Sequence, residues 1–238
     1  MKYGIGTLFV VICFLIISCK NNTSKTEETI PEAPEIEEKH LTLPERIAVA
    51  HGFENWKTID QLAFTFNVDR NEKHFQRSWI WNIKQNTVTH INGTDSLTYN
   101  RKSMDSVAYK TNAGFINDKF WLLAPFNLVW DRNNYTYTHK VLDTTPIGKH
   151  PMQKLTVVYG SKGGYTPGDA YDFYFGDNLI IREWTFREGN QEKPSMSTTW
   201  ENYKEQNGIK IAQEYKGASK DFKLYFDGIK VNGTALDE

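Results

Sequence analysis

Residues that often perform catalysis occur in this chain, but their spacing does not match the common catalytic motifs. None of the six histidines has the HxH or HExxH spacing of a zinc site. The glycine-rich stretch 160–164 lacks the Gly-Lys-Ser/Thr ending of a phosphate-binding loop and is typical of a hairpin. No G-x-S-x-G nucleophile motif is present. Paired carboxylates for glycoside hydrolysis stay open, because such partners can be far apart in sequence. We expect a non-enzymatic protein with no metal site and no cofactor.

Cys19 has the clearest chemistry of any residue. Lys2 precedes an unbroken apolar run, Leu8 to Ile17. As a helix this run would span about 15 Å, about half the hydrocarbon thickness of a bilayer, which is typical of a signal peptide. The following residues resemble the bacterial lipobox, with an aliphatic residue at −3, a small residue at −1 and then Cys19. We predict a signal peptide over 1–18 and lipid attachment at Cys19. An ordinary secretory signal is the alternative.

The segment after this cysteine is polar and acidic. Between Lys20 and Leu43 it contains six glutamates and two prolines, so it cannot bury enough apolar area to offset its ordering entropy. We predict that residues 19–43 form the lipidated cysteine and a disordered tether. Cys13 would leave with the signal peptide, so the mature domain would have no thiol for a disulfide or a thiolate metal site.

Residues 44–238 have the length of one ordinary domain. They contain 24 basic and 23 acidic residues, with no basic clustering, which indicates no nucleic-acid partner. We expect a monomer that contacts the membrane through its lipid anchor.

Alternation of apolar and polar residues dominates this domain and predicts strands. The clearest runs are 64–69, 78–84, 135–141, 154–159, 171–175, 209–215 and 222–227. Turn signals between them, such as Asn207-Gly208, predict about eight to eleven strands in an antiparallel meander with one dry face.

Two helical segments interrupt the strands. Pro44 and Gly52 have the positions expected at the start and end of a helix. Residues 117–131 are apolar without alternation, and they predict a short helix that is capped near Asn117 or Asp118 and ended by Pro125.

The predicted dry face is rich in aromatic side chains. Such rings form either a filled core or a hollow for an acyl chain. The candidate ligand-binding residues are Phe64, Phe66, Trp79, Trp81, Trp121, Phe126, Trp130, Phe173, Phe175, Arg182 and Trp184. Arg182 would share this face with Ile180 and Trp184 if its strand is regular. It could then pair with an anionic headgroup or lie at the edge of the sheet.

The order of these elements resembles the outer-membrane lipoprotein carriers of the LolA and LolB type. The resemblance includes the segments Phe120–Asp131, Gly168–Tyr171 and Trp184–Phe186. It implies a mainly β, α+β fold in which a curved antiparallel sheet forms an open half-barrel. The N-terminal helix and the helical insert would cover that sheet. The predicted lipid anchor on Cys19 departs from the soluble shuttling carriers.

The resemblance implies an envelope lipoprotein that binds or helps transfer a lipid, an acyl chain or a lipoprotein in an aromatic cavity. The expected location is the outer membrane, at its periplasmic face or at the cell surface. A surface carbohydrate-binding or scaffold lipoprotein is the alternative. It would use aromatic residues in the opposite register, namely Tyr174, Tyr203 and Tyr225.

Overall fold

The computed structural model describes residues 40–233 of the chain. Its helical segments are α1 (Leu43–Ala50), η1 (Phe53–Thr58), α2 (Ser106–Trp130) and η2 (Glu188–Asn190). None of these helices is long and apolar enough to cross a membrane.

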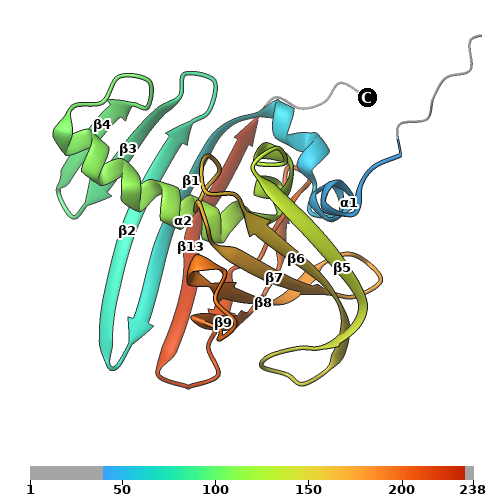
Figure 1. Ribbon diagram of the computed structural model, residues 1–238. Helices are drawn as coiled ribbons and strands as arrows, with labels where there is room; N and C mark the ends of the chain where they lie inside the picture. The colour runs from blue at the N-terminus through green and yellow to red at the C-terminus, as the bar shows by residue number, and fades with distance from the viewer. Residues whose placement is uncertain (1–39, 234–238) are drawn as a thin grey trace, which may run out of the picture. The chain divides into compact units, whose positions relative to one another are not determined.

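The strands form two large antiparallel sheets and one short hairpin (Figure 1). The six-stranded sheet has the order β12-β13-β1-β2-β3-β4 and contains β1 (Ile59–Arg70), β2 (Lys73–Asn82), β3 (Thr87–Asn92), β4 (Asp95–Asn100), β12 (Glu214–Lys216) and β13 (Phe222–Gly233). The five-stranded sheet contains β5 (Tyr135–Thr144), β6 (Pro151–Tyr159), β7 (Ala170–Phe175), β8 (Ile181–Arg187) and β9 (Met196–Thr199), in that order. The hairpin consists of β10 (Lys204–Gln206) and β11 (Ile209–Ile211).

Isolated bridges join the two large sheets at β9 and β12. Thr198 bridges Gly217, and Glu201 bridges Glu214. The strands therefore follow one another from β5 through β9, β12 and β13 to β4. The outer edges, β4 and β5, do not pair with each other within the described residues. This arrangement is the open antiparallel half-barrel that the sequence predicts.

The alternation in the sequence sets the inner and outer faces of the long strands. Phe64 lies opposite Trp79 in the β1–β2 register, and both side chains are buried. Their neighbours Thr65 and Ser78 point to the other face, where their hydroxyl groups form a 2.8 Å hydrogen bond. Each strand thus places rings inside and polar groups outside.

The edge strand β5 departs from this pattern. Tyr137 and Val141, which were expected to lie on the dry face, are 43% and 72% exposed. A register shift between Lys140 and Asp143 interrupts the pairing of β5 with β6. The side chains of residues 136–142 on this strand are exposed, whereas Tyr135 at its start packs against the core.

Helix α2 is longer than the sequence analysis predicted. It starts at Ser106 rather than near residue 117, because the Asp105 carboxylate caps it by accepting a 2.8 Å hydrogen bond from the backbone N–H of Ala108. Pro125 does not end the helix, as was expected, but lies inside it. The helical turns before residue 117 were missed because exposed side chains such as Tyr109 hide the apolar pattern.

The proline bends α2 instead of stopping it. Leu123 has non-helical backbone angles, with φ −125° and ψ 26°. A proline removes one helical N–H donor and clashes with the carbonyl four residues earlier, which here belongs to Trp121. The buried hydroxyl of Tyr215 on β12 donates a 2.9 Å hydrogen bond to that carbonyl. The sheet therefore satisfies the group that the bend releases, and both halves of α2 stay within the half-barrel.

Candidate ligand pocket

A pocket of ≈ 270 Å³ lies between α2 and the five-stranded sheet. Its walls come from α2, from the loop between β6 and β7, and from strands β7, β8 and β9. The lining residues are Asn117, Phe120, Trp121, Tyr165, Thr166, Tyr171, Trp184, Phe186 and Met196. Most of this surface is aromatic, so the pocket suits an apolar ligand.

The wall formed by α2 is held in place by ring contacts to the strands. The ring of Trp121 meets that of Trp184 edge to face, with centroids 4.4 Å apart. Phe120 contacts Tyr171 at 5.1 Å and Trp184 at 5.9 Å. The backbone carbonyl of Trp121 also accepts the hydrogen bond from Tyr215 at the bend in α2. This bond fixes the position of Trp121 in the pocket wall.

Tyr165 closes one side of the pocket. Its ring stacks on Phe120 with centroids 3.8 Å apart and an interplanar angle of 2°. The preceding Gly164 has φ +75°, and a Cβ there would lie 2.6 Å from the ring of Tyr159. Only glycine fits this position, which explains why the loop is glycine-rich. Burial raises the pKa of the Tyr165 phenol, so this ring stays neutral at physiological pH.

One hydrogen-bond donor in the pocket wall has no partner. The indole Nε1 of Trp184 is buried and bonds to no group within the described residues. The hydroxyl groups of Thr166 and Tyr171, by contrast, bond to each other at 2.9 Å. An unsatisfied buried donor costs free energy. Trp184 therefore holds one unpaired donor in this wall, covered by the neighbouring atoms.

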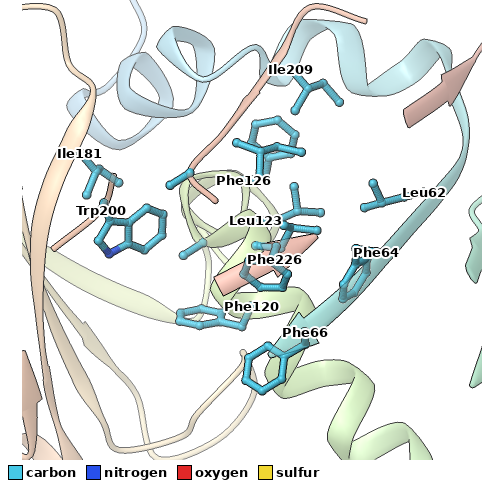
Figure 2. Packing of buried hydrophobic residues seen from close by; sticks show 14 of the residues in the cluster. Leu62, Phe64, Phe66, Phe120, Leu123, Phe126, Ile181, Trp200, Ile209 and Phe226 are labelled. Atoms are coloured by element: carbon cyan, nitrogen blue, oxygen red, sulfur yellow. The ribbon is translucent and has the colours of Figure 1, made fainter. Parts of the chain in front are cut away.

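The structure separates the aromatic residues proposed from the sequence into two groups. Trp121 and Trp184 line the pocket. The fully buried rings pack into a continuous core, part of which Figure 2 shows around Phe64, Phe126 and Phe226. The proposed residues in that core are Phe64, Phe66, Trp79, Trp81, Phe126, Phe173 and Phe175. Trp130 is partly buried and packs against the same core.

Arg182 does not lie on the inner face where it was expected. The β7–β8 register shifts between Tyr174 and Phe175, which pair with Glu183 and Ile181, so Arg182 is the extra residue of a bulge. Its side chain is exposed, and its guanidinium carbon lies 5.9 Å from the ring centroid of Tyr203. The regular alternation assumed for this strand was therefore wrong at this position.

Several lining residues were not proposed from the sequence. Phe120 and Tyr171 fall inside the segments that resemble the lipoprotein carriers, so their importance was indicated but not assigned. Tyr165 gave no such signal, because the glycine-rich loop that carries it was interpreted as a simple hairpin. Its role depends on how the loop folds back over α2.

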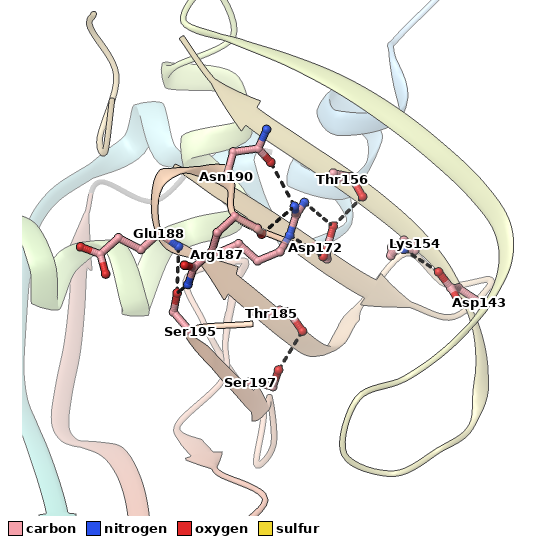
Figure 3. A network of polar contacts seen from close by, with 11 residues as sticks. Asp143, Lys154, Thr156, Asp172, Thr185, Arg187, Glu188, Asn190, Ser195 and Ser197 are labelled. Atoms are coloured by element: carbon pink, nitrogen blue, oxygen red, sulfur yellow. Dashed lines mark hydrogen bonds and ion pairs between the residues drawn. The ribbon is translucent and has the colours of Figure 1, made fainter. Parts of the chain in front are cut away.

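The outer face of the five-stranded sheet carries a polar network rather than an aromatic platform (Figure 3). Asp172 accepts a 2.6 Å hydrogen bond from the Thr156 hydroxyl and forms an ion pair with Arg187 at 3.2 Å. Tyr174 is buried, and the hydroxyl of Tyr203 donates to the carbonyl oxygen of Ile181 at 2.8 Å. Tyr225 lies on β13, in the other large sheet. These tyrosines do not form one surface.

No protein-family model and no curated protein matches this chain. Solved structures with a similar fold include the following three. A DUF1329 family protein from Desulfovibrio piger has 11% identity and a TM-score of 0.46, covering 78% of this chain and 90% of its own. A LolA superfamily protein from Nitrosomonas europaea has 10% identity and a TM-score of 0.47, covering 81% and 93%. A putative outer membrane lipoprotein-sorting protein domain from Vibrio parahaemolyticus has 9% identity and a TM-score of 0.45, covering 81% and 94%.

One of these structures is named as a LolA superfamily protein and another as a lipoprotein-sorting protein domain. Their likeness to this chain is one of fold only. The function proposed below is therefore based on the pocket and on the residues of this chain.

Proposed function

We propose that this protein is a lipid-anchored envelope lipoprotein that binds an acyl chain or a similar apolar ligand in the pocket between α2 and β7–β8. The observation that carries the proposal is an aromatic pocket with Tyr165 stacked over one wall. Cys19 and the predicted signal peptide lie outside the described residues. The anchor is therefore proposed from the sequence alone, as is the outer-membrane location.

Entry of a ligand would require Tyr165 to leave Phe120. Separating such an aromatic pair costs about 0.5–1.5 kcal/mol in addition to the cost of exposing its buried area. The bound acyl chain would contact Phe120 and Trp184, and Tyr165 would then close over it as the outer wall. The carboxyl or ester oxygen of the chain could accept from the free indole N–H of Trp184. The loop thus acts as a lid, and contacts between the ligand and the pocket offset part of the free energy needed to open it.

Removing the lid should weaken binding. We expect Tyr165→Ala to lower the affinity for a fluorescent fatty acid by about tenfold, which corresponds to about 1.4 kcal/mol, because the variant loses one apolar wall. The measurement is a fluorescence titration of the full chain, with native mass spectrometry to identify any ligand that copurifies. Tyr137→Ala is the matched control, since Tyr137 is exposed on β5. Equal affinity in both variants, or no uptake by the wild type, would contradict the proposal.

The anchor has a separate test. We expect Cys19→Ser to abolish incorporation of labelled palmitate and to release the protein from the membrane fraction, because the acyl chains are attached to this thiol. Cys13→Ser should leave both properties unchanged. Density-gradient separation of the envelope would show whether the wild type lies in the outer membrane. Membrane association of unlabelled Cys19→Ser would show that the anchor is not this cysteine.

A further inference from the structure

Two cationic side chains, Lys119 of α2 and Arg101 of the connection between β4 and α2, lie near each other on a side of the helix that does not line the pocket. The guanidinium carbon of Arg101 is 5.3 Å from the ring centroid of Phe115. Lys119 follows Phe115 by four residues, so these two side chains are neighbours on one helix face. The Lys119 ammonium in turn lies 4.8 Å from the ring centroid of Trp130. Both residues are partly buried as a whole, and burial is the main cause of the lowered pKa of each charged group.

Neither cation has an acidic partner. Within the described residues, no ion pair involves Arg101 or Lys119. Arg101 donates to the side-chain carbonyls of Asn112 and Asn86, at 3.2 and 3.4 Å, and has further N–H groups left. Asp131 forms no ion pair with Lys119, although its charge acts on the ammonium, and its Oδ2 accepts hydrogen bonds from Asn127 and Tyr159.

A third donor in the same cluster is also unused. The Trp81 side chain is only 7% exposed, and its indole Nε1 has no hydrogen-bond partner within the described residues. Arg101 lies 6.0 Å from the centroid of this ring. The ring of Trp56 contacts both Trp81, at 5.4 Å, and Trp130, at 5.2 Å. The cluster therefore combines donors that lack a hydrogen-bond partner with apolar ring surface.

We propose that Arg101, Lys119 and the indole N–H of Trp81 form a binding site for an oxyanion, either a phosphate or a carboxylate. An oxyanion would supply the acceptors that these donors lack, through charge-assisted hydrogen bonds. The rings of Trp56 and Trp130 would contact an apolar chain attached to that group, which favours an amphiphile such as a lipid over a free ion.

The charge state of Lys119 agrees with this assignment. Burial, together with the charge of Arg101, lowers the pKa of Lys119 to about 8, against the smaller opposing effect of Asp131. A bound anion would restore the charged form, because an opposite charge nearby favours it.

This site is separate from the pocket. Asn117, Phe120 and Trp121 line the pocket, and at 3.6 residues per turn they share one side of α2, with Lys119 pointing to the opposite side. The oxyanion site therefore does not depend on the proposed function, and either could fail alone.

The test uses the full chain in a non-ionic detergent, with isothermal titration of octyl phosphate, inorganic phosphate and octanol. We expect octyl phosphate to bind and octanol not to bind at this site. Lys119→Met should weaken octyl phosphate binding at least tenfold. Lys110→Met, which removes an exposed charge from the same helix, should leave it unchanged. Urea unfolding of each variant would confirm that the fold is intact.

A second measurement reports on the site directly. The indole N–H resonance of Trp81, assigned with Trp81→Phe, should shift with octyl phosphate and not with octanol. Tighter binding of octyl phosphate than of inorganic phosphate would support a lipid headgroup, whereas equal binding would support the oxyanion site with a free ion as its ligand. Binding that is unaffected by Lys119→Met, or an unmoved Trp81 resonance, would overturn the proposal.

Discussion

Replacing Asp118 with alanine should destabilise the fold by about 3–5 kcal/mol, the range observed when one partner of a buried ion pair is removed. Asp118 is fully buried on α2 and accepts hydrogen bonds from Arg77 Nε at 2.9 Å and Nη2 at 2.6 Å. It also accepts from Trp79 Nε1 at 2.8 Å and from the side-chain amide of Asn117 at 3.0 Å. Without the Asp118 carboxylate, the Arg77, Trp79 and Asn117 donors lose their acceptor, and the Arg77 guanidinium loses its ion-pair partner. Urea unfolding of the full chain measures the loss.

Two variants make this expectation specific. Asp69→Ala removes an exposed aspartate that contacts His74, and we expect it to cost less than about 1 kcal/mol. The double variant Arg77→Met/Asp118→Met removes both charges and should be more stable than Asp118→Ala, because apolar residues of similar size often replace buried pairs well. A small change in the free energy of unfolding for Asp118→Ala would show that the packing of α2 does not depend on this ion pair.

Acidification should destabilise the protein through His51. This side chain is fully buried at the end of α1, with Nδ1 2.8 Å from the carbonyl oxygen of Ile47. Burial lowers its pKa from 6.5 to about 4, although the hydrogen bond to Ile47 opposes the shift. The unfolded chain therefore binds a proton between pH 6.5 and 4 that the folded chain does not. Stability is full above pH 6.5 and falls by about 3 kcal/mol as the pH decreases to 4.

The contribution of His51 is obtained by difference. Urea unfolding at several pH values should show a shallower loss in His51→Gln than in the wild type across this range, even though the variant is less stable at pH 7. His139→Gln, at an exposed position on β5, should follow the wild type. Parallel curves for His51→Gln and the wild type would mean that another group causes the acid sensitivity.

The architecture was predictable because it depends on local patterns. Alternation in stretches such as 64–69 specifies which side chains face inward, whatever the distant partner strand is. The same pattern failed at Arg182, where a bulge adds one residue to β8. A bulge arises from pairing between strands, and the sequence of one strand does not record it.

The helix insert shows a similar limit. The apolar residues from Phe120 onward predicted a helix, but the start at Ser106 and the bend at Leu123 were not anticipated. Pro125 was expected to end the helix because its ring removes a hydrogen bond. The helix continues because Tyr215, 90 residues later in the chain, donates to the released carbonyl of Trp121. Such compensation is visible only when both segments are placed together.

The sequence by itself determined a curved antiparallel sheet with an aromatic inner face, and it identified Cys19 as the proposed anchor. Only the tertiary structure decided which rings fill the core and which line a pocket, because a buried ring and a pocket-lining ring have the same pattern in a strand. It also decided the pairing of Asp118 with Arg77 and the grouping of Arg101 with Lys119. Asp118 and Arg77 are 41 residues apart in sequence, and packing of α2 against β2 brings them together. Arg101 approaches Lys119 because the chain turns back from β4 into α2.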